Sequence, residues 1–404
     1  MAIEESLATD RNKAIDFYMK MFGNEKMKVL MIGGLACGKT TTLASLFHQM
    51  MNSDTNNIFT VIDKSSQNDC EHNKKSLIGK CLELRFLIEN QRTSPFLMPD
   101  SPDCYVCDHT LHFRSRMSNS AQSVDIVFHE IPGSMWNPKN FKYHAQELSK
   151  STADYADYDV YVVCIDTPYL MSDNEKEVRG VNNIESIHAF LMQTVGKINK
   201  KAKQIMFVPV KCEKWVKEGR INDVVTAVET FYADTIRSLK DSDKTEISII
   251  PVQTIGGICF KEWLDSYVLF NTQTQRQIPC AKINNEIVRI PDGRYHKISE
   301  CEMINENVDA YTSVDGLLVK RRDPWYECLS DGNIGYQPAN CEQLFLHIIR
   351  FMCTRFIKDI SPFLLEDYLG FSHKRRMMMN ELLREANKLI TDSGGGIKII
   401  KRYI

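Results

Sequence analysis

Residues 33–40 combine glycines, a lysine and a threonine at a spacing that suits phosphate binding. The run has the form GxxxxGK[ST] and reads Gly33-Gly34-Leu35-Ala36-Cys37-Gly38-Lys39-Thr40. Such glycines let backbone N–H groups turn toward phosphate oxygens, Lys39 can reach the β- and γ-phosphates, and the Thr40 hydroxyl can bind Mg²⁺. The sequence therefore predicts a nucleotide site made of Gly33, Gly34, Ala36, Cys37, Gly38, Lys39, Thr40 and Thr41.

Two flanking segments must position this loop. Residues 27–32 are an apolar run, which predicts a buried strand. The following segment carries apolar residues at helical spacing, namely Leu43, Leu46, Phe47 and Met50. A helix whose N-terminus follows the loop adds its dipole to the attraction for phosphate, so the context agrees with the motif.

Further apolar runs predict the rest of the sheet. They fall at residues 124–129, 160–166, 205–210 and 247–252, and helical patterns at 182–199 and 221–239 lie between them. This alternation predicts an α/β, doubly wound, mostly parallel sheet with helices on both faces. Ligands bind at the carboxyl ends of such strands, where Gly33, Glu130, Asp166, Lys211 and Thr254 fall.

Composition narrows the class of protein. The chain has 404 residues, 43% hydrophobic and 25% charged, so it is expected to be globular. Its formal net charge of −2 gives no overall positive charge that would attract nucleic acid. Thirteen scattered cysteines and the absence of a signal-like or membrane-spanning apolar run predict reduced thiols and a cytoplasmic location.

The chain is expected to have three parts. Residues 1–265 would form the nucleotide-binding domain, with a helix at 9–22 and a long insertion at 52–123. The insertion would contain an edge strand at 58–62, a helix at about 72–92 and a strand at 105–113 that forms a hairpin with 124–129. Residues 266–336 have short β-like runs between polar turns and predict a small β-rich insertion. Residues 337–404 predict a C-terminal helical segment that packs on the first domain.

The segments after the phosphate loop resemble, in order, those of TRAFAC-class P-loop GTPases, the translation-factor-like and Ras-like group. They are most similar to the DO-GTPase (double-GTPase) domains of bacterial conflict systems in EIPGS (130–134), DVYVVCIDTP (159–168), VPVKCEKW (208–215) and IIPVQTIGGI (249–258). The resemblance covers residues 27 to about 260. It implies an Mg²⁺-dependent GTP/GDP switch, a role in antiphage defence, and a protein partner that contacts the 52–123 insertion.

The resemblance also implies roles for residues near the γ-phosphate. Glu130 stands where the family has the Asp of DxxG, which holds Mg²⁺ through a water, and the N–H of Gly133 would meet the γ-phosphate. Ser134 stands where Ras-like proteins have the glutamine that positions water, so hydrolysis should be slow or partner-dependent. The candidate catalytic residues are Lys39, Glu130, Gly133 and Ser134.

The remaining switch residue is expected in the 93–110 segment. A serine or threonine there would sense the γ-phosphate and bind Mg²⁺, with Ser101 preferred over Thr93 and a plain turn as the other interpretation. The candidate Mg²⁺ ligands are Thr40, Ser101 and Glu130.

Base recognition is placed by the resemblance at Val210-Lys211-Cys212-Glu213, the position of NKxD. Glu213 would accept from the two guanine N–H donors and the Lys211 stem would cover the ring, with Thr254 approaching from the last loop. The usual Asn is absent, so an ordinary pair of charged residues at a strand end stays open.

Several alternatives remain at this stage. The chain could be an ATP-dependent phosphotransferase that uses 266–336 as an acceptor lid, or a nucleotide-binding scaffold without turnover. Arg85 and Arg92 could act as arginine fingers in cis or across a dimer, or be ordinary solvated arginines. The cysteines and histidines at 104–112 could bind zinc, but the pattern favours an ordinary strand. The basic run at 374–376 could contact phosphate, but it favours a solvated helix face.

Overall fold

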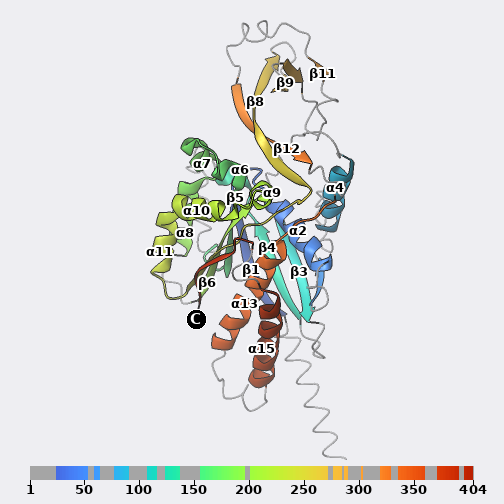
Figure 1. Cartoon of the computed structure of the whole chain (residues 1–404). Helices are drawn as coiled ribbons and strands as arrows, with labels where there is room; N and C mark the ends of the chain where they lie inside the picture. The colour runs from blue at the N-terminus through green and yellow to red at the C-terminus, as the bar shows by residue number, and fades with distance from the viewer. Residues whose placement is uncertain are drawn as a thin grey trace, which may run out of the picture.

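The structure is a computed structural model, and its described residues form two β-sheets with helices around the larger one (Figure 1). The described residues are 24–52, 59–63, 77–90, 107–115, 123–136, 155–195, 201–271, 276–283, 286–289, 302–303, 319–328, 335–359, 371–390 and 395–403. The expected helix at 9–22, Thr93, Ser101 and the 104–106 part of the zinc hypothesis lie outside these ranges.

The larger sheet has, among the described residues, eight strands in the order β13-β7-β6-β5-β1-β4-β3-β2. These strands are β1 (Asn24–Gly33), β2 (Phe59–Asp63), β3 (Cys107–Ser115), β4 (Ser123–Glu130), β5 (Val160–Asp166), β6 (Lys203–Val210), β7 (Thr245–Ile249) and β13 (Lys398–Lys401). The central pairs β4·β1, β1·β5, β5·β6 and β6·β7 are parallel, whereas β2, β3 and β13 join antiparallel at the edges. The predicted α/β, mostly parallel fold is confirmed.

Helices cover both faces of this sheet (Figure 1). One group is α2 (Lys39–Asn52), α4 (Leu77–Asn90), α13 (Cys341–Asp359) and α15 (Phe371–Leu389), and the other is α7 (Glu175–Val181), α8 (Ile184–Thr194), α10 (Ile221–Phe231) and α11 (Ala233–Lys240). Short helices η2 (Gly133–Trp136), α6 (Thr167–Leu170) and α9 (Glu213–Lys217) follow strand ends. None of the helices in the described ranges is long and apolar enough to cross a bilayer.

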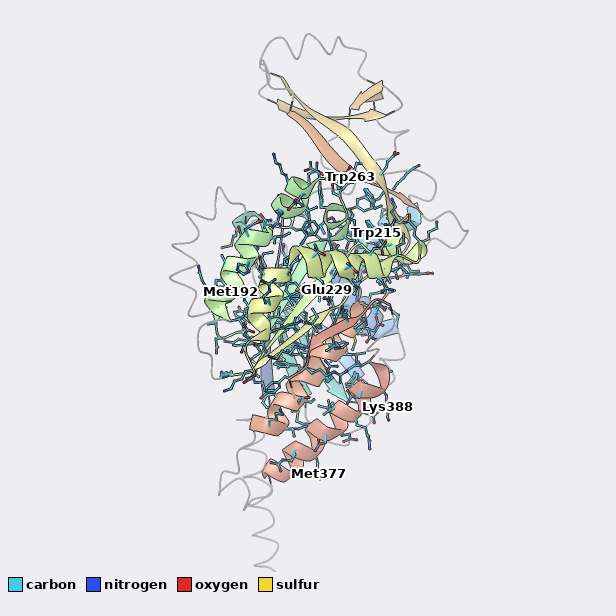
Figure 2. All side chains as sticks on the ribbon, turned by 60° about the vertical axis from the view of Figure 1, so that its left-hand side comes forward. Met192, Trp215, Glu229, Trp263, Met377 and Lys388 are labelled. Atoms are coloured by element: carbon cyan, nitrogen blue, oxygen red, sulfur yellow. The ribbon has the colours of Figure 1, made fainter. Side chains whose placement is uncertain are left out.

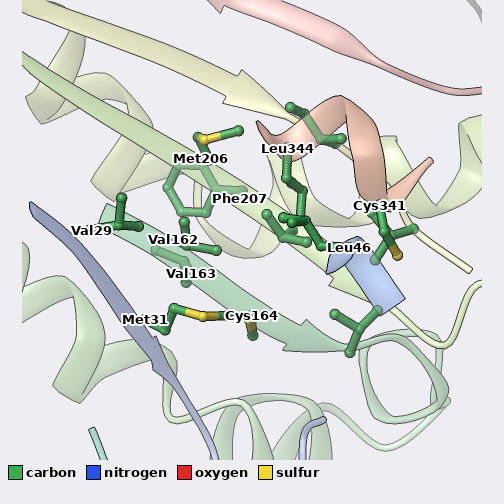
Figure 3. Close-up of a cluster of buried hydrophobic side chains, with 14 of the residues drawn as sticks. Val29, Met31, Leu46, Val162, Val163, Cys164, Met206, Phe207, Cys341 and Leu344 are labelled. Atoms are coloured by element: carbon green, nitrogen blue, oxygen red, sulfur yellow. The ribbon is translucent and has the colours of Figure 1, made fainter. Parts of the chain in front are cut away.

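The core lies between the central strands and these helices. Every residue of β5 and of β6 is buried, which is the pattern of strands covered on both faces. Figure 3 shows Val162 and Phe207 of the sheet near Leu46 of α2 and Leu344 of α13. The C-terminal segment thus contributes to the core that holds the phosphate loop, since α13 packs on α2 and β13 pairs with β7.

The smaller sheet of the described residues has five antiparallel strands in the order β11-β10-β9-β8-β12. They are β8 (Ile258–Asn271), β9 (Arg276–Ile283), β10 (Glu286–Arg289), β11 (Glu302–Met303) and β12 (Val319–Cys328). The paired β8 and β12 project from the larger sheet beside α9 (Figure 1), and we call them the β arm. The β arm starts directly after the loop that follows β7, at the carboxyl edge of the larger sheet.

Candidate functional site

The phosphate loop connects the end of β1 to the start of α2. Lys39, only 6% exposed, folds back over the loop, and its Nζ lies 3.3 Å from the Gly33 carbonyl oxygen and 3.2 Å from that of Gly34. Gly38 has φ +100°, a left-handed conformation that glycine adopts without steric cost. The ammonium is therefore held at the loop, where it can meet anionic oxygens.

Close backbone packing fixes the loop on two sides. A Cβ on Gly34 would lie 2.3 Å from the Val181 carbonyl oxygen, and one on Gly133 would lie 2.4 Å from the backbone nitrogen of Leu35. Only glycine permits these approaches. Gly133, which begins η2, is thereby coupled directly to the phosphate loop.

Thr40 and Glu130 meet at the start of α2. The Thr40 hydroxyl donates to the Glu130 carboxylate, with Oγ1 2.8 Å from Oε1 and 2.9 Å from Oε2. The parallel pairing of β1 with β4 explains the contact, because Glu130 lies beside Met31 at the end of the sheet. One hydroxyl and one carboxylate fit a hard cation that takes its other ligands from nucleotide phosphates and water. Within the described ranges, no cluster of three His, Cys, Asp or Glu side chains could hold a metal by itself.

Lys211 links three elements of the site. It follows β6 with φ +62°, and its Nζ lies 3.1 Å from the Ala36 carbonyl oxygen and 2.6 Å from Asp166 Oδ2. Asp166 ends β5 and caps α6 by accepting from the Tyr169 N–H. Burial is the largest single influence and disfavours the charged ammonium, but the surrounding groups, led by the Asp166 carboxylate, together raise the pKa of Lys211. A charged Lys211 is therefore anchored across the phosphate loop.

Glu213, the first residue of α9, organises the loop after β7. Its Oε1 accepts from the backbone N–H groups of Ile255 at 2.8 Å and Gly256 at 3.2 Å. Its side chain is buried, and burial raises its pKa although these two hydrogen bonds act in the opposite direction. The carboxylate keeps lone pairs for a ligand, since two oxygens offer about four acceptor sites.

Thr254 lies in the same loop and is also buried. Its carbonyl oxygen accepts from the Ser45 hydroxyl, which lies 2.7 Å from the Tyr336 hydroxyl. The loop after β7 is thereby tied to α2, the helix that begins at the phosphate loop.

The structure brings most of the expected site residues to one edge of the sheet. They are Gly33, Gly34, Ala36, Cys37, Gly38, Lys39, Thr40, Thr41, Glu130, Gly133, Lys211, Glu213 and Thr254. Ser101 and the side chain of Ser134 lie outside the described part. Their roles, like the ligand and metal roles of the other residues, stay predictions.

Comparison with known proteins adds little to this geometry. No family model matches the sequence, nor does any curated protein. Among solved structures, the chain is similar to the S. cerevisiae Ski7 GTPase-like domain bound to GTP, with a TM-score of 0.31 and 12% identity over 78% of each chain. The same domain bound to GDP and inorganic phosphate gives a TM-score of 0.29, again with 12% identity over 78% of each chain. Because both TM-scores are low, the fold assignment rests on the sheet order described above.

Two site residues escaped the sequence reasoning in different ways. Asp166 was placed at the right edge but given no role, although an acid at the end of a fully buried strand is a signal that it needs a partner. Tyr326 of β12 carried no signal, because it reaches Lys211 only through the pairing of β8 with β12.

Proposed function

We propose that this chain is an Mg²⁺-dependent guanine-nucleotide switch with slow or partner-stimulated GTP hydrolysis. The observation that carries the proposal is the position of Lys211, whose Nζ contacts the phosphate loop at Ala36 while its backbone lies two residues from Glu213. The Lys211 side chain thus connects the phosphate loop to the end of β6 that leads into Glu213, and so places the phosphate-binding and proposed base-reading residues beside each other.

The phosphate end supplies a cation and a hard-metal site. Lys39 is aimed into the loop, and the hydrogen-bonded pair Thr40 and Glu130 would hold Mg²⁺, directly through Thr40 and through a water for Glu130. When bound, Mg²⁺ neutralises phosphate charge and orients the β- and γ-phosphates. The chain's own residues bind and orient the nucleotide.

The base end favours guanine. Guanine presents two N–H donors on the edge where Glu213 offers acceptors only, and adenine has no such pair. The Glu213 carboxylate is held in place by Ile255 and Gly256, so it is already oriented before a base arrives. Such preorganisation lowers the entropy cost of recognition.

Slow GTP hydrolysis is expected because two residues differ from the pattern of the GTPases that the chain resembles. Ser134 replaces the water-positioning glutamine, and Glu130 replaces aspartate. Gly133 packs on the phosphate loop, so loss of the γ-phosphate would be felt first by η2, which makes this segment the proposed switch element.

A protein partner at the 52–123 insertion is part of the proposal. Helix α4 in this insertion exposes Ile78, Leu82 and Phe86 by 52%, 60% and 66%, at a spacing that puts them on one face. An exposed apolar stripe of this kind supports protein binding. The resemblance to DO-GTPase domains extends the proposal to a bacterial antiphage system in which this partner carries the signal.

Nucleotide content and affinity test the proposal. We expect the purified chain to carry guanine nucleotide, and Lys39→Ala to weaken GTP binding by roughly 10- to 100-fold because a charge-assisted donor is lost. Lys28→Ala is the matched control, since the Lys28 side chain is half exposed and its ion pair with Asp157 lies at the surface. A preference for ADP, or GTP affinity unchanged by Lys39→Ala, would overturn the proposal.

Phosphate release from GTP, measured for the chain alone and with its native partner, separates a switch from a scaffold without turnover. Transfer of phosphate from ATP to an acceptor would identify a phosphotransferase.

A further inference from the structure

The β arm joins the larger domain through a cluster of aromatic side chains, which we call the aromatic root. Its members are Tyr169, Trp215, Phe260, Trp263 and Tyr326. Ring centroids lie 4.6 Å apart for Tyr169 and Trp263, and 6.0 Å apart for the stacked Trp215 and Phe260. Figure 2 places Trp215 and Trp263 where the β arm meets the domain. Aromatic pairs at these distances attract one another beyond simple burial, so the β arm is attached to the domain by packing as well as by the chain.

Tyr326 is the member of the aromatic root that reaches the nucleotide site. Its ring centroid lies 5.9 Å from Lys211 Nζ and 6.4 Å from the Phe260 centroid. The register of β12 on β8 shifts between Trp325 and Tyr326, so this pair of strands has a bulge just where it meets the domain. A bulge redirects a side chain, and this one lies where Tyr326 approaches Lys211.

The Tyr326 hydroxyl is buried and makes no hydrogen bond of ordinary geometry within the part of the chain that the structure describes, although the Lys211 ammonium is near enough to act on it as a weak donor. The residue is 4% exposed, and the charges of Lys211, Asp166 and Glu213 all act on the hydroxyl. Burial raises the pKa of this phenol, so it stays protonated and can donate. Native buried polar groups nearly always have partners, and an orphan beside a ligand site points to a ligand.

We propose that Tyr326 forms a wall of the base pocket and that its hydroxyl hydrogen-bonds the nucleoside part of the bound nucleotide. The inference rests on the proposed function, because Lys211 and Glu213 define the base end of the site. It adds the β arm to the nucleotide contacts. Residues from three places, the ends of β6 and β7 and the root of the β arm, then surround one nucleoside.

A phenylalanine substitution separates ligand contact from a structural role. In Tyr326→Phe, loss of an unpartnered hydroxyl should leave the melting temperature of the nucleotide-free chain unchanged or raise it. Its GDP affinity with Mg²⁺ should fall by about 3- to 10-fold, as expected for one neutral hydrogen bond. The matched control is Tyr161→Phe, since the Tyr161 hydroxyl lies 2.7 Å from the Tyr155 carbonyl oxygen at the opposite end of β5. This control should lower the melting temperature and leave GDP affinity unchanged.

Three outcomes would overturn the inference. GDP affinity that is unchanged or higher in Tyr326→Phe would show that the hydroxyl does not contact the nucleoside. A melting temperature lowered as much as in Tyr161→Phe would show that the hydroxyl has a partner inside the protein. Failure of the wild-type chain to bind GDP would overturn the proposed function itself, and the inference with it.

Discussion

The Thr40 hydroxyl lies within 2.9 Å of both carboxylate oxygens of Glu130, and so joins the first turn of α2 to the end of β4. A threonine that bonds a metal through its oxygen must turn its proton toward an acceptor, and Glu130 is that acceptor. The pair therefore supports metal binding and gives the helix a fixed start. It also predicts that the two residues respond together to magnesium.

Thr40→Ala should weaken GTP binding mainly when Mg²⁺ is present, because a direct oxygen ligand is removed. We expect a loss of at least about tenfold in Mg²⁺ and little loss in EDTA. Thr40→Ser keeps the hydroxyl and serves as the control. Equal losses in Mg²⁺ and in EDTA would contradict the metal role and leave only the hydrogen bond to Glu130.

Glu213→Gln tests base recognition without disturbing the fold. The amide oxygen of glutamine can still accept from Ile255 and Gly256, and the variant removes a buried charge, so thermal stability should not fall. GDP affinity should fall by roughly 30- to 100-fold, since a charge-assisted bidentate pair is worth on the order of 2–3 kcal/mol. ADP affinity should not fall in parallel.

The control for this experiment is Glu218→Gln, at an exposed position near the end of α9. This substitution should reduce the free energy of GDP binding by less than about 1 kcal/mol. Isothermal titration of GDP and ADP at one magnesium and salt concentration gives the comparison. If both nucleotides weaken equally, Glu213 does not read the base.

Asp166→Ala should destabilise the domain strongly. It leaves the Lys211 ammonium buried without its carboxylate, and breaking a buried ion pair from one side typically costs about 3–5 kcal/mol. Urea unfolding measures this loss. Asp157→Ala is the matched control, because its pair with Lys28 is about half exposed and should contribute less than about 1 kcal/mol. Equal losses of unfolding free energy in the two variants would show that the buried Asp166–Lys211 pair contributes no more to stability than a surface pair.

Lys203 predicts a pH dependence of stability. Its Nζ donates to the Ala156 carbonyl oxygen at 2.7 Å and to that of Tyr158 at 2.5 Å, and burial lowers its pKa to about 8 from an ordinary 10.5. Between these pH values the unfolded chain binds more protons than the folded one, so the free energy of unfolding should rise with pH. Below pH 8 Lys203 is protonated in the folded protein, so the full destabilisation caused by burying its charge is present.

We expect wild-type stability to gain on the order of 1–2 kcal/mol, relative to Lys203→Met, as the pH rises from about 7 to about 10. The comparison with Lys203→Met cancels the contribution of the tyrosines, whose pKa values are raised by burial in the folded protein but are about 10 in the unfolded chain. Parallel unfolding curves for the two proteins across this range would contradict the lowered pKa.

The sequence predicts those parts of the site that local patterns determine. The strand, loop and helix around Lys39 follow from an apolar run, glycines and a helical repeat, all within 25 residues. Glu130 and Lys211 could be placed because they lie at the ends of buried strands in a mostly parallel sheet, whose carboxyl ends share an edge. Glu213 is assigned only through the resemblance to the NKxD segment. The antiparallel pairing of β3 with β4 is also predicted, because a polar turn between two strand-like segments indicates a hairpin.

Long-range contacts are the part that sequence patterns could not supply. Tyr326 lies 115 residues after Lys211, and their contact depends on the register of β12 against β8 and on the bulge in that pair. Asp166 and Lys211 are likewise 45 residues apart and meet because β5 and β6 are neighbours. The pattern of residues within one segment carries no information on contacts with distant segments.

The length of β8 gives the aromatic root a mechanical consequence. Tyr326 pairs with Phe260, so 11 residues of β8 lie beyond it and extend roughly 36 Å at about 3.3 Å per residue; a tilt of about 5° at Tyr326 would therefore move the far end by about 3 Å. The β arm would then work as a pointer, converting a small change beside the nucleoside into a large displacement at β9 and β10. A partner that reads this displacement would sense occupancy of the pocket from a distance, without touching the nucleotide.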